Sequence, residues 1–199
     1  MMIKKYPIFL NLQNRNLLIV GGGLACLEKL QGLENTEAII TIITRDLHPE
    51  VQAFVNGKNH IKVILRDVVA ADLEDRDIIF LATNDPETNQ QFRSIAKSLK
   101  TWANSVDDPR NCDFYSASLI NLGAVSFAIS TDGNFAGLTA SLRRLFEEVL
   151  PEGDSELFEK IYAMRRELKE KLPDLAERRN VLKTIIHDLE NKYFRKKSD

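Results

Sequence analysis

The first part of this sequence predicts an α/β fold with a doubly wound parallel sheet. Short runs of apolar, often β-branched residues alternate with segments of helical periodicity, and loops rich in glycine or polar residues follow the runs. Alternation at this spacing is typical of parallel strands joined by helical crossovers. Because such sheets bind their ligands beyond the carboxyl ends of the strands, we expect a functional site at that edge.

Four apolar runs are predicted strands of this sheet, namely residues 17–20, 38–44, 61–65 and 78–83, and residues 101–106 are the fifth predicted strand. The predicted helices are residues 24–33, a segment that begins at Pro49, and residues 86–100. The run 38–44 consists mainly of isoleucine and threonine, so we expect it to be buried on both faces of the sheet.

A glycine triplet directly follows the first predicted strand, and a helical pattern follows the triplet. In this order a strand, a glycine turn and a helix bring backbone and free helical N–H groups close to a pyrophosphate. The third position of the glycine fingerprint is Cys26, which is still small enough for close packing of helix on strand. We therefore predict a Rossmann-like nucleotide-binding domain, with an ordinary glycine turn as the alternative. The predicted contacts are Gly21, Gly22, Gly23, Leu24 and Ala25.

Polar residues follow two further strands of the predicted sheet. Arg45 and Asp46 come after residues 38–44, where an acid of the Rossmann fingerprint binds the adenosine ribose. Arg45 is also suited to a 2′-phosphate, so these residues leave both NAD and NADP open, and a plain surface pair is the alternative. Thr83 and Asn84, at the end of residues 78–83, complete the predicted cofactor site.

The pattern changes in the second half of the chain. Residues 116–121 and 125–131 resemble two strands, and because no crossover separates them we expect antiparallel pairing. Residues 138–150 form an amphipathic helical pattern. From residue 155 onward we expect helices that are interrupted at Pro173, with Asp174 as the N-cap of the last one.

Composition excludes several classes of protein. The chain of 199 residues has a formal net charge of −2, so no global charge favours nucleic acid or an anionic membrane. Its apolar runs are too short for a transmembrane helix, and the run at residues 6–10 is too short for a signal peptide. The two cysteines make no disulfide framework, so we expect a cytoplasmic, reducing environment.

The histidines and cysteines show no metal-ligand spacing, so the sequence predicts no metal site. These residues are His48, His60, His187, Cys26 and Cys112, and we expect surface or packing roles for them.

Several stretches, taken in order along the chain, resemble one known family. They are residues 6–10, 18–23 with Lys29, 82–89, 104–109, 127–133, 142–144 and 177–179. Together they are similar to the precorrin-2 dehydrogenase family, the dehydrogenase module of siroheme synthases. Some members of that family also act as sirohydrochlorin ferrochelatases.

The resemblance implies an organisation and a reaction. It implies an NAD-binding domain at residues 1–111, a strand and helix dimerisation region at residues 112–150, and a helical domain at residues 151–199. It further implies a homodimer in which NAD accepts a hydride from precorrin-2 to give sirohydrochlorin, for siroheme or cobalamin biosynthesis. Ferrous or cobaltous ion is then a second substrate if a chelatase activity is present. Asp107 aligns with the carboxylate important to the family, although a turn is the alternative for this residue.

The chain departs from the family pattern at two places. Glu28 stands where an arginine is common, and residues 131–136 lack the usual Ser-Pro segment. The altered segment 131–136 motivates an alternative, a non-catalytic module that senses NAD(H). A third hypothesis is a dehydrogenase for another polyanionic substrate. Lys29, Arg110, Arg143 and Arg144 are candidates for pairing with substrate carboxylates, with a solvated surface as their alternative role.

Overall fold

The computed structural model describes residues 5–108, 112–122, 125–131, 136–149, 163–164 and 166–189. By its internal contacts the chain divides into two compact units. The first comprises Met1–Ser118 and Ile129–Ser141, and the second comprises Leu119–Ala128 and Leu142–Asp199. The domain boundaries expected at residues 111 and 150 stay predictions.

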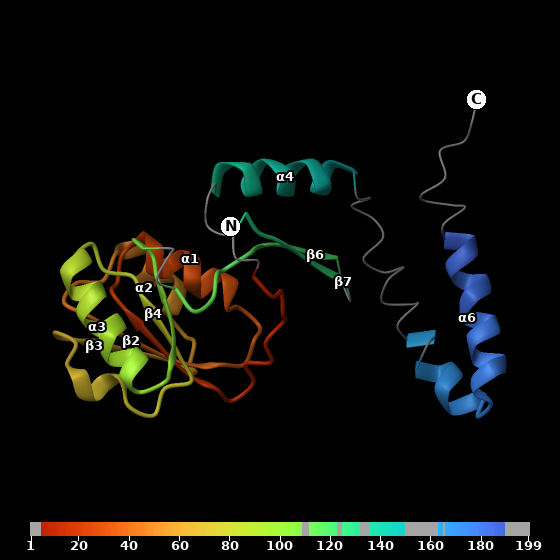
Figure 1. Cartoon of the computed structure of the whole chain (residues 1–199), viewed down its shortest axis with the longest axis horizontal. Coiled ribbons are helices and arrows are strands. Elements are labelled where there is room, and N and C mark those ends of the chain that lie inside the picture. The colour runs from red at the N-terminus through yellow and green to blue at the C-terminus, as the bar shows by residue number, and fades with distance from the viewer. Residues whose placement is uncertain are drawn as a thin grey trace. The chain divides into compact units, whose positions relative to one another are not determined.

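The first unit contains the predicted parallel sheet (Figure 1). Its strands are β1 (Asn16–Val20), β2 (Ile39–Thr44), β3 (Ile61–Leu65), β4 (Ile78–Leu81) and β5 (Trp102–Ser105). They lie in the order β3-β2-β1-β4-β5, and every pair of neighbours is parallel. The Rossmann-like α/β prediction is therefore confirmed. The chain changes direction across the sheet between β1 and β4, which places the expected ligand site beyond the ends of these two strands.

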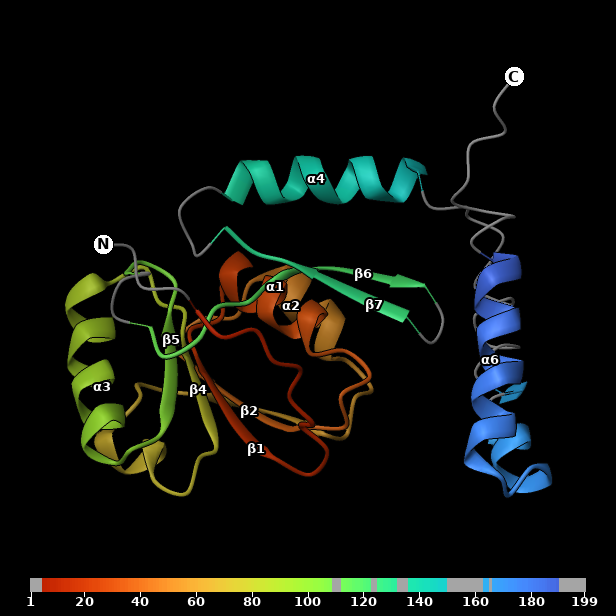
Figure 2. The same cartoon turned by 45° about the vertical axis from the view of Figure 1, so that its right-hand side comes forward.

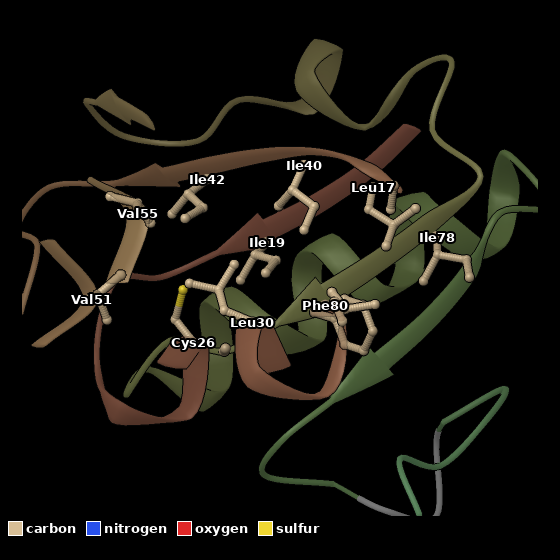
Figure 3. Close-up of a cluster of buried hydrophobic side chains, with 13 residues drawn as sticks. Leu17, Ile19, Cys26, Leu30, Ile40, Ile42, Val51, Val55, Ile78 and Phe80 are labelled. Atoms are coloured by element: carbon tan, nitrogen blue, oxygen red, sulfur yellow. The ribbon is translucent and has the colours of Figure 1, made fainter. Parts of the chain in front are cut away.

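Successive side chains of each strand point to opposite faces of this sheet. Because both faces are apolar, helices cover both of them. Leu17 and Ile19 of β1 pack in one cluster with Cys26 and Leu30 of α1 (Leu24–Gly32) and with Val51 of α2 (Pro49–Val55). Figure 3 shows Cys26 and Leu30 lying against Ile19. A Cys at the third fingerprint position thus packs as a buried apolar group.

The opposite face is covered by the 3₁₀ helix η1 (Ala70–Leu73) and by α3 (Pro86–Ser98). Leu18 and Val20 of β1 pack there with Leu73 and Phe92. The sequence did not predict η1. It forms because the Asp72 carboxylate accepts the Val69 backbone N–H at 2.8 Å and so closes a short turn.

The register of the strands aligns their ends at one edge. Val20 pairs with Ile43 on one side and with Leu81 on the other. The residues that follow each strand, glycine after β1 and polar residues after β2 and β4, therefore meet at the carboxyl edge.

The later elements that the structure describes agree with the sequence pattern, whereas residues 150–162 of the expected helical region lie outside the described residues. Strands β6 (Ser118–Leu122) and β7 (Val125–Ile129) form a two-stranded sheet and lie side by side in Figures 1 and 2. The helices α4 (Ala136–Val149) and α6 (Leu175–Leu189) follow. The Asp174 carboxylate accepts the Glu177 backbone N–H at 2.8 Å, which confirms the predicted cap of α6. Among the described residues, no helix is both long enough and apolar enough to cross a bilayer.

Candidate functional site

A cavity of about 820 Å³ lies at the carboxyl ends of β1, β2, β3 and β4. This volume is in the range of small-molecule and cofactor sites. The predicted cofactor residues all line it, namely Gly21, Gly22, Gly23, Leu24, Ala25, Arg45, Asp46, Thr83 and Asn84. The structure thus brings together residues from three separate stretches. Asp107 is not among the lining residues.

The glycine triplet meets two different requirements. Gly21 has a φ of +111°, and a Cβ there would lie 2.3 Å from the Ala82 carbonyl oxygen. A Cβ on Gly22 would lie 2.4 Å from the Asp46 carbonyl oxygen. Gly23 has open space within 4 Å of a Cβ. The first two glycines are therefore needed by the protein itself, whereas Gly23 leaves room for a ligand beside the turn.

The N-terminus of α1 has no cap from the protein. Its N-cap is Gly23, no side chain accepts from its first turn, and that turn contains no acid. By contrast, α2 and α3 begin with side-chain caps from His48 and Asp85. Free N–H groups and a positive dipole end therefore face the cavity at α1, which suits an anionic group such as a pyrophosphate.

A buried amide holds the turn after β4 in place. Asn89 of α3 is 1% exposed, and its side-chain oxygen accepts from the Thr83 hydroxyl at 2.7 Å. Its amide nitrogen donates to the Thr83 carbonyl at 3.1 Å. Sequence reasoning did not single out Asn89. Its position one turn before the buried Phe92 places it on the inner face of α3, and a polar residue there was the available signal.

Two ion pairs lie on the β3 side of the cavity. The guanidinium of Arg45 donates to the Asp67 carboxylate, and this contact raises the pKa of Arg45. Arg66 binds Asp72 through two hydrogen bonds of 2.6 and 2.7 Å. The same contact lowers the pKa of Asp72. Arg66 and Asp67 line the cavity but follow β3, a strand whose end the sequence analysis did not examine.

A second, smaller pocket of about 260 Å³ lies beside the end of β5. Ala25 at the start of α1 lines both cavities, so they adjoin there. The lining is mainly polar and includes Lys29, whose side chain is 11% exposed and whose ammonium lies 2.9 Å from the Glu28 carboxylate. The lining thus contains the Glu28–Lys29 charged pair and a set of hydroxyl groups. These hydroxyls belong to Ser105, Tyr115, Ser116, Ser118, Ser130, Thr131 and Thr139.

Asp107 lies just beyond β5, next to this second pocket. Its side chain is exposed, and its carboxylate accepts from the Ser105 hydroxyl. Cys112 holds the same segment in place through two hydrogen bonds to Ser105. Its sulfur accepts the Ser105 N–H at 3.1 Å, and its S–H donates to the Ser105 carbonyl at 3.2 Å. Burial raises the pKa of the Cys112 thiol. Ser105 and Val106 line the second pocket, although Asp107 itself does not.

The other candidates for carboxylate binding are not among the described residues that line these cavities. Arg143 of α4 forms an ion pair with Glu147 at 2.9 Å, and Arg143 and Arg144 belong to the second unit. Arg110 and residues 132–135 of the altered loop lie outside the described residues. Within the part of the chain that the structure describes, no three His, Cys, Asp or Glu side chains cluster as metal ligands.

Comparison with known proteins decides the family. A family model described as putative NAD(P)-binding matches residues 8–118. The chain belongs to this family. The family description names a nicotinamide dinucleotide as the ligand. The uncapped N-terminus of α1 and the cavity beyond β1 and β4 are consistent with this ligand. The prediction of this cofactor class is therefore confirmed at the level of the family.

The chain is also similar to siroheme synthases. The one from Psychrobacter cryohalolentis is 32% identical over 91% of this chain and 34% of its own length. The one from Zymomonas mobilis is 32% identical over 87% of this chain and 36% of its own length. The chain thus spans about a third of these relatives. A solved structure of SirC, a precorrin-2 dehydrogenase, matches with a TM-score of 0.75 and 23% identity over 92% of this chain and 89% of that one.

Proposed function

We propose that this protein is an NAD-dependent precorrin-2 dehydrogenase that forms sirohydrochlorin. The observation that carries the proposal is the proximity of the two cavities: Ala25 lines both, so a dinucleotide-sized site lies close to a second pocket with polar lining residues. The names of the similar proteins, siroheme synthase and precorrin-2 dehydrogenase, support this substrate. The reaction removes a hydride and protons from precorrin-2 and so extends its conjugation.

The residues of the large cavity fit the dinucleotide. The free N–H groups at Leu24 and Ala25 bind the pyrophosphate, for which Gly23 leaves space. Asp46 accepts hydrogen bonds from the adenosine ribose, and the turn at Thr83 and Asn84 supports the nicotinamide half. When bound, the nicotinamide ring supplies the hydride acceptor.

The small pocket fits one edge of the substrate. A volume of about 260 Å³ is less than a whole macrocycle requires, so part of the substrate stays outside the pocket. Precorrin-2 is ringed by carboxylates, and Lys29, whose side chain is largely buried, attracts one of them through its ammonium. Glu28 moderates this attraction because it already pairs with Lys29.

Asp107 is the proposed proton acceptor. A carboxylate beside the pocket takes a proton from the macrocycle as the hydride leaves. The hydrogen bond from Ser105 orients that carboxylate. This role rests on the position of Asp107 directly after two pocket-lining residues, Ser105 and Val106.

The test is anaerobic absorbance spectroscopy with precorrin-2 generated in the cuvette. We expect the sirohydrochlorin spectrum to form with NAD and to depend on the protein. Asp107→Asn should lower turnover by at least about a hundredfold, the usual contribution of an acid or base, while calorimetry shows retained NAD binding. Asp108→Asn is the matched control and should keep its turnover.

Other outcomes separate the alternatives. NAD binding without any turnover favours the NAD(H)-sensing module, for which the Glu28–Lys29 pair is an argument because it weakens the attraction of a polyanion. Turnover of a different polyanion, without competition by sirohydrochlorin, favours the third hypothesis. Addition of ferrous or cobaltous ion to the product tests the proposed chelatase activity in the same cuvette.

We further propose a homodimer in the cytoplasm. Large apolar side chains that are exposed in the second unit support an interface, and these are Leu119, Phe127, Leu145 and Phe146. Both cysteines are free thiols, as expected in a reducing compartment. Light scattering after size exclusion tests the dimer, and a monomer at micromolar concentration would contradict it.

A further inference from the structure

The edge of the large cavity between β2 and β3 is crowded with charge. Thr44 of β2 pairs with Leu65 of β3, so the residues that follow these strands are neighbours. The Arg45 guanidinium donates to the Asp67 carboxylate across this edge. Both side chains are well exposed, at 78% and 66%. The pair therefore lies in solvent at the mouth of the cavity and contributes little to folding.

Neither arginine at this edge is free to bind an added phosphate without losing a partner. Arg45 donates to Asp67, and Arg66 donates to Asp72 through two hydrogen bonds of 2.6 and 2.7 Å. Asp46 and Asp85 add two further carboxylates to the lining, and both act on the charge of Arg45. Together with Asp67 and Asp72, four carboxylates therefore lie near the two guanidiniums. A dinucleotide with a 2′-phosphate must place its extra negative charge in these surroundings, whereas a free 2′-hydroxyl needs only an acceptor.

We propose that Asp67 selects NAD over NADP by holding the Arg45 guanidinium and opposing the 2′-phosphate. The inference rests on the proposed function, since it assumes that the adenosine ribose lies beside β2. The inference adds Asp67, which follows β3, to the residues that select the cofactor. In the Rossmann fingerprint this role belongs to the acid that follows β2. Removal of the Asp67 charge frees Arg45 to bind a phosphate.

Calorimetric titration with NAD and with NADP tests this role without any turnover. In the wild-type protein we expect tighter binding of NAD. Asp67→Asn keeps the shape of the side chain but removes its charge. It should lower the ratio of the NADP to the NAD dissociation constant roughly tenfold at low salt, the size of one charge interaction at a protein surface. Higher salt should reduce the effect because exposed charges are screened.

Two further variants isolate the cause. Glu34→Gln removes the carboxylate of another exposed ion pair, with Lys58 at 3.0 Å, and Glu34 does not line the cavity. It makes the same change in net charge and should leave the ratio of the two dissociation constants unchanged. The double variant Asp67→Asn with Arg45→Gln should lose the gain in NADP binding, because the freed guanidinium is absent.

The outcomes are distinct from failure of the proposed function. An unchanged ratio in Asp67→Asn overturns the inference even if NAD-dependent turnover is found. The same gain in NADP binding in Glu34→Gln, or in the double variant, overturns it as well, because it shows a general charge effect or no role for Arg45. A protein that binds NAD but turns over no precorrin-2 contradicts the proposed function and leaves the role of Asp67 open to the same titration.

Discussion

Substitution of alanine at three glycines should separate what the fold needs from what the ligand needs. Gly21→Ala places a Cβ in a left-handed conformation at φ +111° and 2.3 Å from the backbone oxygen of Ala82. The conformation alone costs roughly 1–3 kcal/mol, and overpacking costs roughly another 1–3 kcal/mol. Because β1 and β4 are hydrogen-bonded neighbours in the middle of the sheet, neither strand can move away. We expect a loss of about 4 kcal/mol in the free energy of unfolding.

Gly57→Ala provides the conformational cost by itself. Gly57 has a φ of +76°, but a Cβ there meets nothing within 4 Å. We expect a loss of about 1 kcal/mol, close to the lower end for a left-handed residue. The difference between the two variants then measures the clash of Gly21 with the end of β4.

Gly23→Ala should show the opposite behaviour. Gly23 has extended backbone angles, φ −88° and ψ −167°, and a Cβ there meets open space. The loss in unfolding free energy should stay below about 1 kcal/mol, the difference between glycine and alanine at an N-cap. The new methyl group enters the space beside the free N–H groups of α1, so affinity for NAD should fall at least about tenfold.

Urea denaturation measures the free energy of unfolding of each variant. The probe is the fluorescence of Trp102 in β5, the only tryptophan of the chain. Calorimetric titration with NAD measures the affinity for the cofactor. If Gly23→Ala lowers stability as much as Gly21→Ala, the assignment of the two roles is wrong. Unchanged NAD affinity in folded Gly23→Ala refutes the placement of the pyrophosphate.

Two further substitutions test the surroundings of the cavity. Asn89→Ala leaves polar groups of Thr83 without their partner and should cost roughly 1–3 kcal/mol in urea denaturation and weaken NAD binding, whereas Gln90→Ala, the exposed amide next to it, should do neither. The hydrogen bonds from Arg66 lower the pKa of Asp72 in the folded protein. The ionised Asp72 carboxylate therefore stabilises the fold above the ordinary carboxyl pKa of about 3.9. This stabilisation is lost as pH falls through the lower pKa of the folded state. Asp72→Asn should therefore flatten the pH dependence of the unfolding free energy below about pH 4, and an unchanged acid slope would count against this ion pair.

Local pattern was sufficient to predict the sheet of the first unit. Strands β1, β2 and β4 are short, mostly apolar runs that are buried on both faces, and glycine or polar residues follow them within two positions. Burial on both faces leaves little choice except a parallel strand between helices. Two predicted strand ends, at Thr83 and Val106, lie beyond the observed ends of β4 and β5. The backbone N–H and carbonyl of Thr83 bond with the Asn89 amide of α3 instead. Val106 still donates its N–H to the Leu81 carbonyl, but the strand ends one residue earlier, at Ser105.

Residues of the cavity were predictable where one chain segment contains the whole signal. The glycine turn, Arg45 and Asp46 follow strands whose role is fixed by the fingerprint, so their place at the cavity follows from order alone. Asp67 and Asn89 were not predictable in this way. Asp67 acts through a partner 22 positions earlier, and Asn89 acts through Thr83 across the turn. Such contacts depend on the register of β2 with β3 and on the rotation of α3, which no local pattern contains.

The distribution of charge along the carboxyl edge links these observations to the proposed chemistry. At α1 the protein provides uncapped N–H groups and no acid, which favours the pyrophosphate. Toward β3 it adds carboxylates that oppose a further phosphate, and toward β5 it places the ammonium of Lys29, on a largely buried side chain, for an anionic substrate. Because these three environments lie along one edge, a dinucleotide bound at α1 has only one orientation that satisfies them: adenosine toward β3 and nicotinamide toward the second pocket. The reverse orientation places the adenosine against the pocket that Lys29 and the hydroxyl groups line, and leaves the nicotinamide without a neighbouring substrate.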